Sequence, residues 1–198
     1  MINEGRNSKM FPFAEDLHDS IDYLNLSGIK SYNFVGCGMP TIGKIKVKKE
    51  KSWIGKLFGE KEDYELGYTD GDETVPLVSS NKTIGSEIYY VNSTTHGTLP
   101  SAVGVQENVL AILNDTSMIF NDTIQDNDSY CGIEGDVLST HSPVEIHVYD
   151  EEGNHVGPNA DGDIEYDIPG VQYDVIDDIN YVFLPAGNNY KVVTKATD

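Results

Sequence analysis

The segment YTDGDETVPLVSS, residues 68–80, places Asp70, Asp72 and Glu73 side by side although their negative charges repel each other. His96 follows in a polar stretch further along the chain. A carboxylate that holds one ring nitrogen of a histidine leaves the other nitrogen free to move a proton. These residue types predict an acid–base pair made of a carboxylate and His96, and the alternative is an acidic turn followed by an exposed loop histidine.

The pair requires elements that bring the two positions together. Residues 31–36 and 86–92 are aromatic and β-branched, which predicts two strands, and apolar spacing predicts helices over residues 12–28 and 101–113. In an α/β sheet the functional groups gather at the carboxyl ends of the strands. We therefore expect the acidic turn and His96 to face each other at one edge of such a sheet.

A basic segment lies between these expected strands. Seven of the thirteen lysines and arginines fall within residues 44–61, and alternating Ile45 and Val47 predict one arm of a hairpin. Four apolar side chains in the segment are candidates for a lid or a lipid interface: Trp53, Ile54, Leu57 and Phe58. The alternative is an exposed hairpin insertion whose aromatic side chains pack locally.

The composition changes along the second half of the chain. Residues 114–142 are rich in Asn, Asp, Ser and Thr, which predicts a linker. After Pro143, five short alternating runs bounded by turn residues predict a small antiparallel β-sandwich over residues 143–198. The predicted organisation is an α/β domain over residues 1–113, a linker over 114–142 and a β-sandwich.

Three blocks in order, YNFVGCGMPT, GDETVPLVSS and THGTLPSAVGVQENVLAIL, resemble the lecithin:cholesterol acyltransferase family and related bacterial lipases. The resemblance covers residues 10–113 and implies the carboxyl-terminal part of an α/β-hydrolase sheet. It implies that Asp72 is the acid and His96 the base of a Ser-His-Asp triad acting on lipid esters, with Asp70 and Glu73 as solvated neighbours. The family has Gly where this chain has Glu73. The final module resembles β-sandwich domains appended to secreted bacterial hydrolases.

The nucleophile of such a triad is missing, because these 198 residues contain no Gly-x-Ser-x-Gly pentapeptide. The resemblance places Cys37 after the nucleophile, as a small buried residue. The chain is therefore expected to be inactive alone and to need an amino-terminal hydrolase segment, or another chain, that covers the sheet edge near residues 31–36. The alternative function is a non-catalytic binding or adhesion protein with a degenerate hydrolase scaffold.

The overall charge limits the partners. The formal net charge is −20, from 33 acidic and 13 basic residues, and such a negative surface repels phosphate backbones, so no nucleic-acid partner is expected. Contact with a lipid surface is expected only at the basic segment, residues 44–61. Acidic turns such as DGDET do not fit a calcium loop, so no metal and no cofactor are expected. Two cysteines make no disulfide framework, and the compartment stays open, with an extracellular location among the options.

Overall fold

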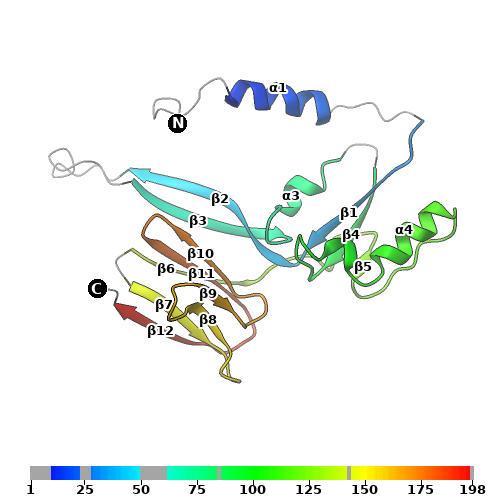
Figure 1. Ribbon diagram of the computed structural model, residues 1–198. Coiled ribbons are helices and arrows are strands. Elements are labelled where there is room, and N and C mark those ends of the chain that lie inside the picture. Colours follow the sequence, from blue (N-terminus) through cyan, green and yellow to red (C-terminus); the bar gives the residue numbers. More distant parts are fainter. Residues whose placement is uncertain (1–9, 23–27, 50–61, 84–85, 142–143, 197–198) are drawn as a thin grey trace.

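A computed structural model describes residues 10–22, 28–49, 62–83, 86–141 and 144–196 (Figure 1). Within these ranges the chain forms twelve strands, three α-helices and one short 3-10 helix. None of the described helices has the length and apolar character needed to span a bilayer.

The first sheet is built on a parallel pair of strands. β1 (Ser31–Cys37) runs parallel to β4 (Ser86–Asn92), and β5 (Ile124–Gln125) adds to the other side of β4, so the order is β1-β4-β5. The η1 turn (Leu99–Ser101) and α4 (Val105–Leu113) follow β4. The buried core on this sheet contains Tyr89 and Val91 of β4, Val105 of α4 and Ile124 of β5. Both residues 31–36 and 86–92 form strands, as their β-branched and aromatic side chains predict.

A long antiparallel hairpin follows β1. β2 (Met39–Lys49) pairs with β3 (Glu62–Gly71), and α3 (Leu77–Ser80) comes directly after the acidic turn. The hairpin packs against the carboxyl-terminal strands through Leu66, which is buried with Ile179 and Tyr181. Its Tyr68 hydroxyl donates a hydrogen bond to Asp174 at 2.5 Å, and burial followed by this carboxylate raises the pKa of Tyr68. The hairpin thus joins the first sheet to the carboxyl-terminal part of the chain.

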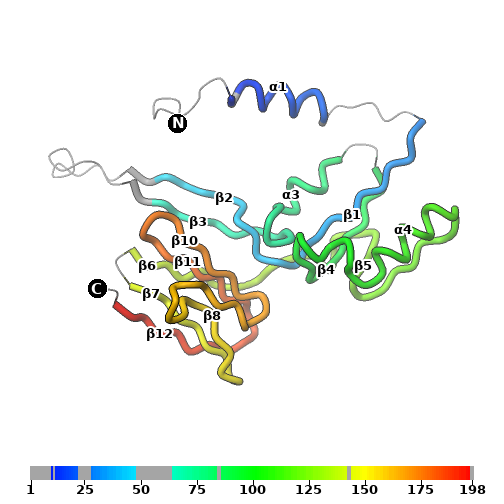
Figure 2. Tube along the Cα trace, in the orientation of Figure 1, coloured from blue at the N-terminus to red at the C-terminus, as the bar shows by residue number. Residues whose placement is uncertain are grey.

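The carboxyl-terminal strands form two antiparallel sheets, of order β10-β11-β6 and β12-β7-β8-β9. Their bounds are β6 Gly135–Thr140, β7 Val144–Tyr149, β8 His155–Pro158, β9 Ile164–Tyr166, β10 Gln172–Ile176, β11 Ile179–Pro185 and β12 Lys191–Ala196. Buried side chains from both sheets, including Ile146, Val156 and Val182, share one core cluster. Figure 2 shows these elements gathered in one body beneath the β2–β3 hairpin.

Two histidines of this body bind each other across neighbouring strands. His147 Nδ1 lies 3.0 Å from His155 Nε2, and His155 Nδ1 lies 2.7 Å from the Glu165 carboxylate. The Glu165 carboxylate can only accept, so Nδ1–H of His155 donates to it, and in neutral His155 the Nε2 atom then carries the lone pair that accepts from Nδ1–H of His147. The three side chains therefore tie β7, β8 and β9 together.

The predicted fold class is wrong. Strands hold 44% of the described residues and helices 17%, in several small and mostly antiparallel sheets. An α/β architecture covers a parallel sheet with helices. Among the described α-helices, α4 alone supplies a buried residue, Val105, to the core of the β1–β4 pair, and the η1 turn adds the partly buried Leu99. β5 and the long hairpin are antiparallel. The sequence predicted local strands and helices, but its prediction that they assemble into an α/β-hydrolase sheet is wrong.

Helix α1 (Met10–Asp22) overlaps the predicted helical range of residues 12–28 and begins two residues before it, but its apolar side chains are exposed. Phe13, Leu17 and Ile21 are each about half exposed or more (66%, 49% and 57%). Figure 1 shows α1 away from the sheets. The amphipathic pattern therefore predicts the helix. Among the described residues, no other element buries its apolar face.

The segment predicted as a linker contains ordered structure. β5 and β6 both lie within residues 114–142, and the β10-β11-β6 sheet therefore includes a strand from before Pro143. Cys131 in the same segment forms a disulfide with Cys37 at the end of β1, closing a loop with a sequence separation of 94 residues. The pairing of the two cysteines was not predicted, because two cysteines far apart carry no spacing signal.

Loss of this disulfide is expected to destabilise the fold. A cross-link that closes a long loop lowers the entropy of the unfolded chain, so Cys131→Ser should lower the free energy of unfolding by about 2–5 kcal/mol. Urea unfolding of the oxidised protein and the variant measures the difference. The variant should match the wild type in the presence of a thiol reductant, and a wild type that is insensitive to reductant would contradict the structural role.

Candidate acid–base site

Asp72 and His96 are in direct contact. The Nδ1 atom of His96 lies 2.9 Å from Oδ2 of Asp72, and the backbone N–H of His96 also donates to the Asp72 carbonyl at 2.8 Å. The Asp72 residue is 4% exposed, whereas the His96 side chain is 54% exposed. The spatial pairing that the sequence predicts is present, with a buried acid and an imidazole open to solvent.

The Asp72 carboxylate is held by its own turn. Its second oxygen, Oδ1, accepts the backbone N–H of Val75 at 2.7 Å and that of Thr74 at 3.1 Å. With Oδ1 occupied, Oδ2 is left for the imidazole. Because the carboxylate accepts from Nδ1–H, the Nε2 atom of His96 carries the lone pair and is free to accept a proton.

Two glycines leave space for Asp72 and for the turn that follows it. A Cβ at Gly36 would lie 2.7 Å from the Asp72 Cβ, and a Cβ at Gly71 would lie 2.4 Å from the Val75 carbonyl. Both distances are shorter than side-chain carbons tolerate. Gly36 is in β1, so the end of the parallel pair sets the position of the acid.

Threonine hydroxyl groups hold both the turn that carries Asp72 and the loop that carries His96. Thr41 Oγ1, buried in β2, accepts the backbone N–H of Glu73 at 2.9 Å. Thr98 Oγ1 lies 2.8 Å from Thr95 Oγ1 and 3.2 Å from the buried Thr94 hydroxyl, on either side of His96. Sequence reasoning missed these threonines, although the run STTHGT surrounds the histidine.

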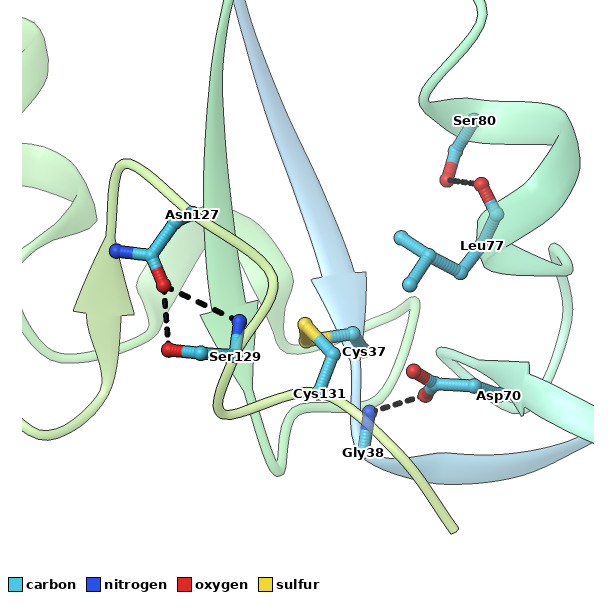
Figure 3. Close-up of a disulfide and its surroundings, with 8 residues drawn as sticks. All are labelled: Cys37, Gly38, Asp70, Leu77, Ser80, Asn127, Ser129 and Cys131. Atoms are coloured by element: carbon cyan, nitrogen blue, oxygen red, sulfur yellow. Dashed lines mark hydrogen bonds between the residues drawn. A yellow bond between two sulfur atoms is a disulfide. The ribbon is translucent and has the colours of Figure 1, made fainter.

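Asp70 is a structural residue rather than a solvated neighbour. Its Oδ1 accepts the backbone N–H of Gly38 at 2.6 Å, beside the disulfide (Figure 3). Burial raises the pKa of the Asp70 carboxyl, and backbone N–H groups of Gly38, Gly71 and Gly132 oppose the shift. The carboxylate of Asp70 therefore holds the β1–β2 turn.

The two cysteines beside Asp70 offer no catalytic or metal-binding group. Cys37, Asp70 and Cys131 place potential ligand atoms within 4.8 Å of one another. Both sulfur atoms are in the disulfide, so neither is a thiolate ligand or nucleophile. Cys37 is fully buried, as expected for the small residue that the sequence predicts.

Glu73 adopts an unusual backbone conformation. Its φ of 71° lies in the left-handed region, where glycine is favoured. Glycine is the residue that the resembling family carries at this position. Partial burial, followed by the charge of Asp72, raises the pKa of the Glu73 carboxyl. The departure from glycine therefore places a strained, negatively charged residue next to the acid.

The acid reaches the site by a route that the sequence did not predict. Asp72 follows β3, the return strand of the antiparallel hairpin, instead of a strand of the parallel sheet. The isolated bridge between Gly71 and Pro76 closes the turn. His96 follows β4, as predicted. The hairpin therefore folds back and delivers the acid to the end of β1.

The lid candidates Trp53, Ile54, Leu57 and Phe58 lie outside the described residues. The strands that precede and follow these residues in the chain, β2 and β3, are paired as far as Lys49 and Glu62. Their contact with lipid stays a prediction.

A pocket of about 400 Å³ adjoins the acid–base pair. Glu73 and Thr95, the chain neighbours of Asp72 and His96, line one side together with Met39. Tyr166 and residues 168–172, from the β9–β10 connection, line the other side. The carboxyl-terminal strands thus contribute a wall next to the imidazole.

Comparisons of the chain with family models, with curated proteins and with solved structures found no match.

Replacing Glu73 with Gly is expected to stabilise the protein. Removing the side chain relieves the left-handed backbone strain, and we expect a gain of up to about 1 kcal/mol in the free energy of unfolding. Urea unfolding of Glu73→Gly and of Glu73→Ala separates the effect of backbone strain from the effect of the side-chain charge. Alanine removes the charge but keeps the Cβ, so an equal gain in both variants would assign the effect to charge and contradict strain.

Proposed function

We propose that Asp72 and His96 are the acid and base of a Ser-His-Asp esterase or acyltransferase that acts on lipid esters. The observation that supports this function is the 2.9 Å contact between a buried carboxylate and Nδ1 of a half-exposed imidazole. This arrangement fixes one tautomer and leaves Nε2 accessible for proton transfer. The class of substrate rests on the resemblance of the three sequence blocks.

The chemistry follows from the tautomer. Nε2 of His96 takes the proton of a serine hydroxyl as its oxygen attacks the ester carbonyl carbon. Asp72 accepts the Nδ1–H hydrogen bond and stabilises the imidazolium that forms. The imidazolium then returns the proton to the leaving alkoxide, and a second cycle with water or an alcohol releases the acyl group.

The serine comes from another segment or another chain. Among the strands that the structure describes, β1 is the edge strand of its sheet, since the order is β1-β4-β5, and this edge can pair with an added strand. Gly36 of this strand contacts the acid, so a strand on the same edge and parallel to β1 would end near Asp72. The exposed apolar face of α1 is a second surface that such a segment would cover. A chain without it is expected to be inactive.

The contact between the two side chains favours catalysis over the non-catalytic alternative. A scaffold that has lost its reaction has no need to keep a buried carboxylate against an exposed imidazole, and burying a carboxylate costs free energy. Here two backbone N–H groups, the imidazole and the space left by Gly36 all serve one carboxylate.

The tautomer of His96 can be tested on the chain itself. Nitrogen-15 NMR should show the proton of neutral His96 on Nδ1 in the wild type. Asp72→Asn should shift the tautomer mixture toward Nε2–H, because Nδ1 can then accept a hydrogen bond from the amide. Asp70→Asn is the matched control, and it should leave the His96 tautomer unchanged. A wild-type His96 with its proton on Nε2 would refute the acid–base pair.

Catalysis can be tested by supplying the serine. Mixing the chain with the serine-bearing segment encoded upstream in its parent gene should restore hydrolysis of a p-nitrophenyl ester. In that complex Asp72→Asn should lower kcat by about 10³- to 10⁴-fold, because the wrong tautomer is favoured. Circular dichroism confirms that the complex is folded. A folded complex that lacks activity, or one in which Asp72→Asn has no effect, would contradict the proposal.

A further inference from the structure

We infer that the pocket beside His96 binds the uncharged acyl or alkoxy group of an ester and discriminates against molecules that carry a carboxylate. The identity of the occupant as part of an ester rests on the proposed function. The discrimination itself follows from the lining of the pocket and is tested without turnover.

The location of the pocket links it to the reaction. Glu73 follows Asp72 and Thr95 precedes His96 in the chain, so the pocket is lined by the chain neighbours of both members of the acid–base pair. The volume of about 400 Å³ falls within the range of small-molecule sites. A compact group that enters the pocket therefore contacts the residues that flank the acid and the base in the chain.

The opposite wall is firmly held. The Tyr166 hydroxyl donates to the Tyr173 carbonyl at 2.8 Å, which anchors the ring at the end of β9. Ile168 and Val171 belong to the core of the carboxyl-terminal strands, with 6% and 4% exposure. This wall therefore presents a preformed surface, and apolar atoms of Met39, Ile168 and Val171 suit an alkyl chain.

The charge of the pocket sets its selectivity. Glu73 is the single acidic residue in the lining, which contains no lysine or arginine. Among the described residues no ion pair neutralises the Glu73 carboxylate, and Asp72 adds a second negative charge nearby. An anionic occupant is therefore repelled, whereas an uncharged amide or ester of the same shape is not. In an esterase the same repulsion would favour release of the carboxylate product.

Butanamide and butanoate test the inference because they have the same size and differ in charge at pH 7. Titration of the isotope-labelled chain should produce NMR shifts at Met39, Thr95 and Tyr166 with butanamide. At equal ionic strength butanoate should bind about two- to fivefold more weakly, the range expected for a partly exposed charge contact. Butanamide that shifts none of these residues, or equal affinity of the two probes, would overturn the inference.

Two matched variants assign the selectivity to a residue. Glu73→Gln should bring the two dissociation constants together by tightening butanoate binding. Glu107→Gln, on α4 and outside the lining, removes the same charge and should leave the ratio unchanged. If Glu107→Gln also removes the preference, the selectivity belongs to the net charge and the inference fails. A His96 proton on Nε2 would refute the acid–base pair alone, since the ranking of the probes does not depend on it.

Discussion

The buried carboxylate of Asp72 is the group around which the first half of the molecule is arranged. Its oxygens accept two backbone N–H groups and one imidazole N–H, so removal from water is compensated by three donors. This requirement explains the glycines at positions 36 and 71, which leave room for the side chain and its turn. It also explains the backbone bond between His96 and Asp72, which keeps the two loops in register.

Three connections hold that arrangement in place from outside the acidic turn. The disulfide joins the end of β1 to the segment that leads into β6. Asp70 ties the adjacent β1–β2 turn to the end of β3. The hairpin packs its Tyr68 and Leu66 against β10 and β11. As a result, the carboxyl-terminal strands are part of the frame of the site, and they also supply one wall of its pocket.

The sequence resemblance and the fold lead to different conclusions about this chain. The sequence blocks around Asp72 and His96 bring these two side chains into contact, as expected for an acid–base pair. Glu73 has a backbone φ angle in the region that glycine prefers. The surrounding architecture is nonetheless mainly β, with a long antiparallel hairpin in front of the acid. A functional proposal for this protein therefore depends on the site and is independent of an α/β-hydrolase fold.

The sequence by itself predicted the local elements and singled out the two side chains that meet in the candidate acid–base site. β-Branched and aromatic runs predicted β1 and β4, apolar spacing predicted α1 and α4, and residue type and order selected Asp72 and His96. Tertiary structure alone decided the antiparallel hairpin route to the acid, the partner of Cys37, the role of Asp70 and the strands within residues 114–142. These features depend on contacts between residues far apart in the chain, and local periodicity carries no information about which distant strand or side chain becomes the partner.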